Sequence, residues 1–249
     1  MILISPAKNL NIETEQVDYN LTIPKFLKKT ENLVSLLKKL SLNDLQSLMK
    51  VSDSLSKLNF ERYRKFEESN LKAAAFLFSG DTFNGLSIRS LNKQFLDYAQ
   101  NNLRILSGLY GILRPFDLIK PYRLEMGTNI KETLGKDLYE FWSNEILKSL
   151  ENDIIKVKSN FLFNLSSAEY FKSVNYNKLD VEVINFDFKK IIDGKMKNIG
   201  MYIKKLRGMM AKFLIENKVT KLNQIKKFKM AGFRFESFDK KNNNFLFLN

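Results

Sequence analysis

Apolar residues recur every three or four positions along several stretches of the chain, and this spacing predicts amphipathic helices. The clearest stretches span residues 24–40, 136–150 and 200–217, and the first begins with a proline suited to an opening helical turn. Ser41 and Ser52 precede two shorter periodic runs, the second reaching Tyr63, and serine is a favoured N-terminal cap. Ser90 similarly predicts a helix that ends near residue 101.

Continuous apolar runs alternate with these helices and predict buried strands at residues 1–4, 73–78, 161–165 and 181–186. Residues 103–106 fit a strand or a helix end equally well. Three asparagines at 242–244 predict a hairpin turn between strands 234–238 and 245–248. The irregular mixture favours an α+β fold with a mixed sheet and surrounding helices. Since the chain holds neither a linker rich in Pro, Gly or Ser nor an internal repeat, we expect one domain over residues 1–249.

The composition removes most kinds of catalytic site. Among 249 residues there is no cysteine and no histidine. Disulfides, thiolate zinc sites, iron–sulfur clusters, cysteine nucleophiles, Ser-His-Asp triads and histidine metal ligands are therefore excluded. Chemistry in this chain is left to carboxylates, lysine, tyrosine, serine and the backbone. We expect no cofactor and no metal, and a binding protein rather than an enzyme.

The basic residues are unevenly distributed. Lysine and arginine number 41 against 27 acidic residues, a formal net charge of +14. Residues 181–249 carry 16 basic and 6 acidic residues, whereas residues 1–180 carry 25 and 21. Such an asymmetry points to a polyanionic partner: nucleic acid, an anionic membrane or a phosphate-bearing ligand.

No stretch is apolar enough for export or membrane insertion. The longest uninterrupted apolar run is residues 73–78, and the short apolar start is followed at once by Pro6 and Lys8. We expect a cytoplasmic monomer without a membrane partner.

The segment 104–115 contains two glycines three positions apart between two arginines. It predicts a tight turn whose backbone amides approach an anion, or an ordinary glycine turn between packed elements. The candidate phosphate contacts are Arg104, Ser107, Gly108, Leu109, Tyr110, Gly111 and Arg114. Neither the Walker spacing nor the Rossmann glycine pattern is present.

Further polar residues follow predicted elements. In an extended segment Arg123 and Glu125 point to one face, as an ion pair or as two groups in a cleft, with Tyr122 beside them. Lys8 follows the first strand. Asp81 follows Ser79 and Gly80, where a helix cap is the common alternative.

The late predicted helix carries a basic face. Lys204, Lys205, Arg207 and Lys212 are expected opposite its apolar stripe, with Gly208 among them. Glycine costs about 1 kcal/mol relative to alanine inside a helix. Its presence suggests that something approaches closely, and we interpret this face as facing phosphate, with a solvated basic face as the alternative.

Several of these segments together resemble the YaaA family of bacterial peroxide-stress proteins. The resemblance rests on the following segments: Ser5–Lys8, Ser79–Asp81, Leu103–Gly111, Arg114-Pro115, Pro121–Gly127, Leu138–Trp142, Glu169–Lys172 and Lys204–Met210. It runs in order through nearly the whole chain. Asn9 stands where the family usually has Thr, and Thr82-Phe83 stands where it has Val-Tyr.

The resemblance implies a single mixed α/β domain of unusual topology that is cytoplasmic and limits iron-driven oxidative damage to DNA. It also implies DNA binding through a positively charged cleft and a helix-hairpin-helix element. Two segments are candidates for that element. One is 106–111, although its glycines are one position too far apart; the other surrounds Ser52, with Lys50 and Lys57 beside it.

The leading hypothesis is therefore a DNA-binding protein without sequence specificity. The alternative is an enzyme or binding protein whose cleft gathers charged residues around a small anion. That cleft would comprise Lys8, Asp81, Arg104, Arg123, Glu125 and Arg207. Adhesion to anionic lipid is a third, weaker hypothesis. Because the chain lacks histidine and cysteine, we expect it to bind no iron stoichiometrically and to have no peroxidase or catalase activity.

Overall fold

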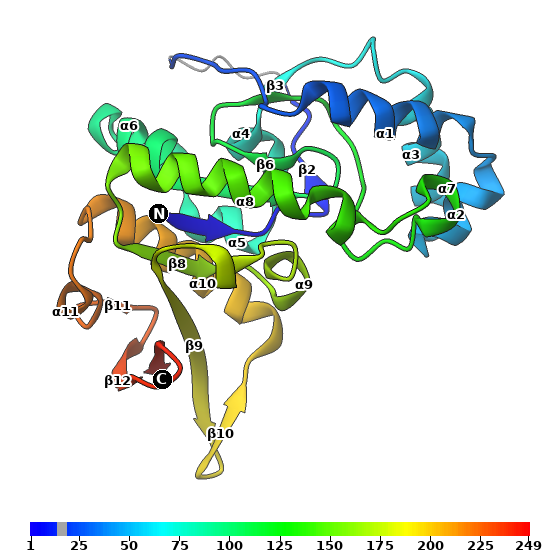
Figure 1. Ribbon diagram of the computed structural model, residues 1–249. Helices are drawn as coiled ribbons and strands as arrows, with labels where there is room; N and C mark the ends of the chain where they lie inside the picture. Colours follow the sequence, from blue (N-terminus) through cyan, green and yellow to red (C-terminus); the bar gives the residue numbers. More distant parts are fainter. Residues whose placement is uncertain (14–18) are drawn as a thin grey trace.

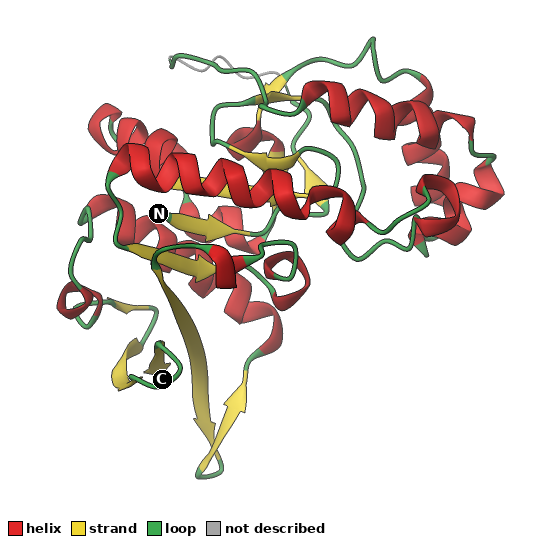
Figure 2. Cartoon of the chain, in the orientation of Figure 1, coloured by secondary structure: helices red, strands yellow, loops and turns green. Residues whose placement is uncertain are grey.

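The computed structural model describes residues 1–13 and 19–249 and arranges them around a mixed sheet (Figure 2). The strand order is β11-β12-β13-β9-β8-β1-β5-β6, and β10 pairs with β9 outside this path. Helix α8 (Leu138–Val157) crosses one face of the sheet, and α5 (Asp81–Leu86) and α10 (Gly200–Glu216) lie behind it (Figure 1). The predicted mixed fold with a mixed sheet is confirmed.

The centre of the sheet is parallel. It consists of β1 (Ile2–Ile4), β5 (Leu103–Ser107), β8 (Phe161–Leu165), β9 (Glu182–Ile192) and β13 (Asn244–Leu248). Strand β1 is completely buried and pairs with β5 on one side and β8 on the other. The connection from β1 thus leads first to β5 on one side, and the chain later adds β8 on the other side of β1. In open parallel sheets, ligands bind outside the carboxyl ends of the strands at such a switch point.

The remaining strands are short. They are β2 (Asn9–Leu10), β3 (Lys72–Ala73), β4 (Phe78–Ser79), β6 (Gly111–Leu113), β7 (Leu118–Ile119), β10 (Lys195–Asn198), β11 (Lys229–Met230) and β12 (Phe233–Asp239). Strands β12 and β13 pair as the antiparallel hairpin that the asparagines predicted. Outside the large sheet, β2 pairs with β4, and β3 pairs with β7.

Helices α1 (Leu27–Lys39), α2 (Leu42–Met49) and α3 (Asp53–Arg64) form a lobe beside the sheet (Figure 1). Ser41 accepts a hydrogen bond from the Asp44 backbone and Ser52 from that of Leu55, so both predicted caps are confirmed. The other helices are α4 (Ala74–Leu77), α6 (Lys93–Asn102), α7 (Lys131–Leu134), α9 (Ala168–Phe171) and α11 (Leu222–Ile225).

Some predicted elements are wrong or incomplete. Residues 73–78 form the single turn of α4 between two short strands, because an unbroken apolar run fits a buried helix as well as a strand. Asn92, rather than Ser90, caps α6, and Ser90 ends a 3₁₀ turn. The predicted strand at 181–186 extends to Ile192.

The extension of β9 pairs with β10 to form a two-stranded hairpin that projects from the body (Figure 1). We call residues 189–198 the arm. Its turn, Asp193-Gly194, has positive φ at both residues (53° and 68°), the combination that suits a two-residue hairpin. Residues 190–197 are all exposed. The arm leads directly into α10.

Candidate functional site

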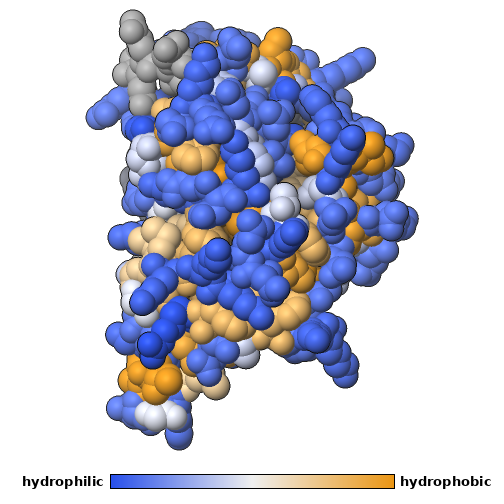
Figure 3. All heavy atoms as spheres, turned by 90° about the vertical axis from the view of Figure 1, so that its left-hand side faces the viewer, coloured by the Kyte–Doolittle hydropathy of each residue, from blue (hydrophilic) through white to orange (hydrophobic). Residues whose placement is uncertain are grey.

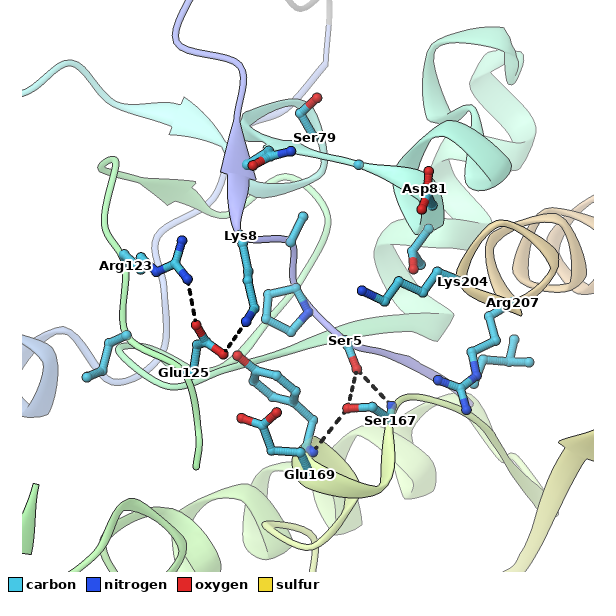
Figure 4. A pocket seen from close by; sticks show the side chains of 18 of the residues that line it. Ser5, Lys8, Ser79, Asp81, Arg123, Glu125, Ser167, Glu169, Lys204 and Arg207 are labelled. Carbon is cyan, nitrogen blue, oxygen red and sulfur yellow. Dashed lines mark hydrogen bonds and ion pairs between the residues drawn. The ribbon is translucent and has the colours of Figure 1, made fainter. Parts of the chain in front are cut away.

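A cavity of about 470 Å³ opens at the switch point, and we call it the switch-point pocket (Figure 4). Its walls come from the segments that follow β1, β4 and β8, from the segment 122–125, and from α10. The polar residues lining it are Ser5, Lys8, Asn9, Ser79, Asp81, Thr82, Tyr122, Arg123, Glu125, Ser167, Glu169, Tyr170, Lys204 and Arg207. Segments far apart in sequence therefore supply one concave polar site.

Two glycines bring α5 and α10 into contact and thereby close one side of the pocket. A Cβ added to Gly85 would lie 2.1 Å from the Lys205 carbonyl oxygen, and one added to Gly208 would lie 1.9 Å from that of Thr82. Each helix thus occupies the space a side chain would need on the other. Because of this crossing, Asp81 at the start of α5 faces the same cavity as Lys204 and Arg207. The close approach that Gly208 predicted is made by a helix, and this corrects its interpretation as a phosphate contact.

One end of the pocket is a cluster in which two cations share one carboxylate. Both oxygens of the Glu125 carboxylate are engaged, one by the Arg123 guanidinium at 2.9 Å and the other by the Lys8 ammonium at 2.7 Å (Figure 4). The Tyr63 hydroxyl donates to the Arg123 carbonyl at 2.7 Å and fixes the backbone. Within the described residues, Arg123 Nε is buried without a hydrogen-bond partner. Two cations therefore fix the Glu125 carboxylate in the wall of the cavity, where it can accept further hydrogen bonds.

The floor of the pocket is a network of hydroxyl groups at the carboxyl ends of β1 and β8. The Ser167 backbone N–H donates to Ser5 Oγ at 2.8 Å, and Ser5 Oγ donates to Ser167 Oγ at 3.3 Å. The Tyr170 backbone N–H donates to Ser167 Oγ at 3.4 Å. Burial, reinforced by nearby Glu169, raises the pKa of Tyr170 well above its usual value, so this phenol stays neutral.

The opposite end carries unneutralised cations. No hydrogen bond or ion pair to another described residue engages the Arg207 guanidinium or the Lys204 ammonium, both of which line the cavity. Burial lowers the pKa of Arg207, and the Asp187 carboxylate opposes this shift. Arginine nevertheless remains charged at neutral pH. This partly buried positive charge thus has no direct ion pair among the described residues, although Asp187 stabilises it electrostatically and Asp81 lines the same cavity.

The glycine segment is a scaffold rather than a surface. Residues 103–113 are all buried and form the β5–β6 hairpin, not two helices. Arg104 is 4 % exposed and pairs with Asp153 at 2.7 Å. This burial corrects the prediction that the following residues contact phosphate: Arg104, Ser107, Gly108, Leu109, Tyr110 and Gly111. Arg104 is likewise absent from the pocket lining, although it was predicted for the small-ligand cleft.

The buried turn instead positions the segment that carries Arg123 and Glu125. A Cβ on Gly108 would lie 2.2 Å from the Leu124 carbonyl oxygen, so only glycine permits this contact. The Gly108 carbonyl accepts a hydrogen bond from the Trp142 indole at 2.8 Å. Nearby, the Tyr122 and Ser107 hydroxyls are 2.7 Å apart. The glycine turn and the segment 121–127 therefore pack against each other.

Two other predicted contacts have structural partners, and a third is half-buried. Arg114 pairs with Asp117 at 2.9 Å and donates to the Ile23 carbonyl. Lys212, predicted to face phosphate, donates to Ser90 Oγ at 2.7 Å and pairs with Glu216 at 3.7 Å. Lys205 is half-buried beside the α5 crossing and does not line the pocket.

The second candidate hairpin joins two helices, as its position predicted. The loop between α2 and α3 exposes Lys50 and Ser52, and the second turn of α3 exposes Lys57. Lys50 adopts a left-handed conformation (φ 51°), and Ser52 caps α3. Asp53 beside this cap accepts a hydrogen bond from the Gln46 amide. The loop is accessible to a partner, but a carboxylate accompanies its lysines.

Sequence reasoning missed one exposed basic feature, which is the arm. Lys190 stands directly opposite Lys197 in the antiparallel register, and Lys195 stands opposite Ile192. Cross-strand partners share a face, so three lysines lie on one side of the arm. The opposite side presents the pair Ile191 and Met196, which are 54 % and 59 % exposed. An apolar cluster surrounded by hydrophilic side chains is visible at the lower end of the molecule, where the arm projects (Figure 3).

The sequence held a signal for the arm and also for the serine floor of the pocket, which sequence reasoning had likewise missed. Four lysines occur between positions 189 and 197, against the single carboxylate of Asp193. Ser166 and Ser167 directly follow the apolar run 161–165, as Ser5 follows the first strand. Polar residues at the carboxyl ends of two buried strands converge whenever those strands are parallel neighbours.

None of the helices in the described part of the chain combines the length and the apolar composition needed to cross a bilayer. Within residues 1–13 and 19–249, no three carboxylates are grouped so that they could hold a metal ion.

Comparisons with known proteins cover almost the full chain. Residues 1–238 match the family model described as peroxide stress protein YaaA. A UPF0246 protein of Pseudoalteromonas translucida is 45% identical over 240 residues, which is 94% of this chain and 92% of that protein. UPF0246 proteins of Polynucleobacter necessarius and Idiomarina loihiensis are 42% identical over 245 residues and 43% identical over 239 residues. These alignments cover 97% and 94% of this chain, and 95% and 93% of the two relatives.

Proposed function

We propose, from the premise that this chain belongs to the peroxide stress protein YaaA family, that it binds duplex DNA without sequence specificity and protects it during peroxide stress. Family membership supports the role in peroxide stress. DNA as the partner follows from the distribution of charge on the surface.

The arm is the observation that carries the proposal. Like charges directly opposite each other in a sheet are destabilising, yet Lys190 and Lys197 stand in that position at an exposed hairpin. The Asp193 carboxylate lies 3.4 Å from the Lys197 ammonium, a long ion pair, and both side chains are largely exposed. Exposed ion pairs of this kind contribute little. A row of phosphates relieves the repulsion between the lysines, and contacts with phosphates carry no sequence information.

The loop between α2 and α3 is the second contact in this proposal. Lys50 in the loop and Lys57 in α3 are both exposed. The loop joins two helices as a helix-hairpin-helix element does. Asp53 partly offsets their charge. We therefore assign the larger share of the binding free energy to the arm.

The same contacts give a route to protection from iron. Lysines that neutralise phosphates release the cations condensed around the duplex. DNA covered by this protein therefore retains fewer ferrous ions beside its sugars, where peroxide would generate radicals. The protein itself needs no iron site for this effect.

A charge reversal tests the proposal. Lys190, Lys195 and Lys197 are changed together to Glu, and binding to a plain duplex is measured by fluorescence anisotropy at several salt concentrations. We expect affinity to fall by about tenfold to a hundredfold, and the slope of log K against log salt to become shallower by about 2 to 3. Nicking of plasmid DNA by ferrous iron and peroxide, measured in parallel, should be slowed by the unaltered protein alone.

The matched control reverses three exposed lysines in α8 and at its C-cap, away from the arm in sequence: Lys148, Lys156 and Lys158. Its change in net charge is identical. Equal losses in the two variants, or unaltered protein whose DNA affinity ignores salt, would contradict the proposal.

Binding of a small anion is a second candidate function, and the pocket favours it. Of the six residues predicted for such a cleft, Lys8, Asp81, Arg123, Glu125 and Arg207 line one cavity and only Arg104 does not. A volume of about 470 Å³ suits a small molecule rather than a duplex.

A further inference from the structure

The switch-point pocket contains a partly buried cation, Arg207, which the Asp187 carboxylate stabilises electrostatically but does not contact in an ion pair. The Arg207 guanidinium is partly buried, and among the described residues it has no ion pair and no hydrogen bond. Burying a charge is costly unless it is paired and hydrogen-bonded. Lys204, one turn earlier on α10, lines the same cavity and also lacks a partner. A bound anion would supply a direct partner to the partly buried Arg207, and the exposed Lys204 lines the same cavity.

The two ends of the pocket differ in what they offer a ligand. Lys204 and Arg207 offer donors to a negative group on one side (Figure 4). On the other side, Glu125 is held by Lys8 and Arg123, and an ionised carboxylate only accepts hydrogen bonds. A ligand that satisfies both ends therefore carries an anion at one end and hydroxyl or amino donors at the other.

Size narrows the choice further. The cavity volume is about 470 Å³. Pockets that bind small molecules commonly have volumes of about 300 to 1,000 Å³. Inorganic phosphate would fill only the cationic end and would make no contact with Glu125 or the serine floor. A duplex does not enter, whereas one nucleotide turned out of its stack does.

We propose that the pocket binds a single nucleotide, with its phosphate between Lys204 and Arg207 and the donor edge of its base at Glu125. The proposal rests on the proposed function in one respect, namely that DNA gripped by the arm supplies the nucleotide from an unpaired position. The chain itself connects the two sites, because β10 of the arm continues through Ile199 into α10. A free nucleoside monophosphate offers the same chemistry, so the test separates the two sources.

The first arm of the test uses free ligands. Deoxynucleoside 5′-monophosphates, the matching nucleosides and inorganic phosphate are titrated into the full chain by calorimetry. We expect the monophosphates to bind more tightly than either part alone. Arg207→Ala should weaken this binding by about tenfold to a hundredfold, the range expected for losing hydrogen bonds to a charged group.

Arg234→Ala is the control for charge. Arg234 is exposed on β12, does not line the pocket and has no assigned role in binding. The variant should bind monophosphates as the unaltered chain does. Circular dichroism and thermal unfolding verify that both variants are folded.

The second arm uses DNA. A duplex containing one extra 2-aminopurine nucleotide is compared with a fully paired duplex, since the fluorescence of this base rises when it leaves the stack. We expect a rise with the unaltered chain and with Arg234→Ala, but not with Arg207→Ala, while all three still bind the duplex.

The outcomes separate the two proposals. Monophosphate binding that depends on Arg207 supports the pocket, with DNA as the source if 2-aminopurine also responds and free nucleotide as the source if it does not. Phosphate that binds as tightly as the monophosphates, absence of binding in both arms, or equal losses in the two arginine variants would overturn it. A chain that binds monophosphates but not duplex DNA would contradict the proposed function, while the proposal that the pocket binds a nucleotide would still hold.

Discussion

The arm and the switch-point pocket are both cationic, yet they are built in opposite ways. The arm comes from ten consecutive residues, and its only carboxylate is that of Asp193. The pocket draws on segments between Ser5 and Arg207 and places Asp81, Glu125 and Glu169 among its cations. Uniform charge suits a polyanion that presents phosphates along its length. Mixed charge with fixed hydrogen bonds suits one ligand in one orientation.

This difference predicts different responses to salt. Binding at the arm should weaken steeply with ionic strength, because each phosphate contact releases counterions. Binding in the pocket should depend on salt less, since partly buried pairs are screened less than exposed ones. The two sites are therefore distinguishable even when one DNA molecule occupies both.

Replacing a glycine beside the pocket by a larger residue should have the largest effect on stability and on monophosphate binding. The same kind of replacement in the arm should have little effect. Gly208→Val places side-chain atoms where the Thr82 carbonyl stands, 1.9 Å from the new Cβ. We expect the free energy of unfolding to fall by about 3 kcal/mol, in the range of severe overpacking, and monophosphate binding to be lost. Urea denaturation and calorimetry measure the two effects.

A glycine in the arm serves as its control. Gly194 has φ +68° and nothing within 4 Å of its added Cβ, and asparagine adopts this conformation readily. Gly194→Asn should change the free energy of unfolding by less than about 0.5 kcal/mol. Comparable destabilisation in both variants would mean that the two sites are not built differently.

Removing the apolar side of the arm should have an intermediate effect. Ile191 and Met196 are largely exposed and face each other across the hairpin. Apolar side chains on DNA-binding arms insert between base steps and kink the duplex. Changing both to Ser should leave stability unaltered and lower affinity for a duplex by about threefold to tenfold. DNA bending, followed by energy transfer between end labels, should also decrease; unchanged bending would restrict the arm to phosphate contacts.

The smallest effect is expected at the loop between α2 and α3. Changing Lys50 and Lys57 together to Ala removes two exposed charges that Asp53 partly offsets. We expect duplex affinity to fall by about twofold to fourfold, with a shallower salt slope. A loss larger than that of the triple arm variant in the same anisotropy assay would reverse the ranking and make this loop the principal contact.

The sequence by itself determined the elements whose cause is local. Ser41 and Ser52 cap their helices through hydrogen bonds within three residues, and periodicity located the long helices. The asparagines at 242–244 marked a hairpin. Composition excluded whole classes of chemistry, because the absence of cysteine and histidine does not depend on the fold. Five of the six residues proposed for a small-ligand cleft also line the observed pocket.

Only the tertiary structure decided the roles of the glycines and of the charged residues near them. Gly108 and Gly208 were interpreted as sites of approach to phosphate, and in both cases the approaching group is the protein's own backbone. Arg104 was expected at a surface and is buried against Asp153. A sequence records that a side chain is missing or charged, but the neighbour that fills the space or meets the charge belongs to a distant segment. Which segments meet depends on how the strands pair across the sheet, and that pairing leaves no local trace.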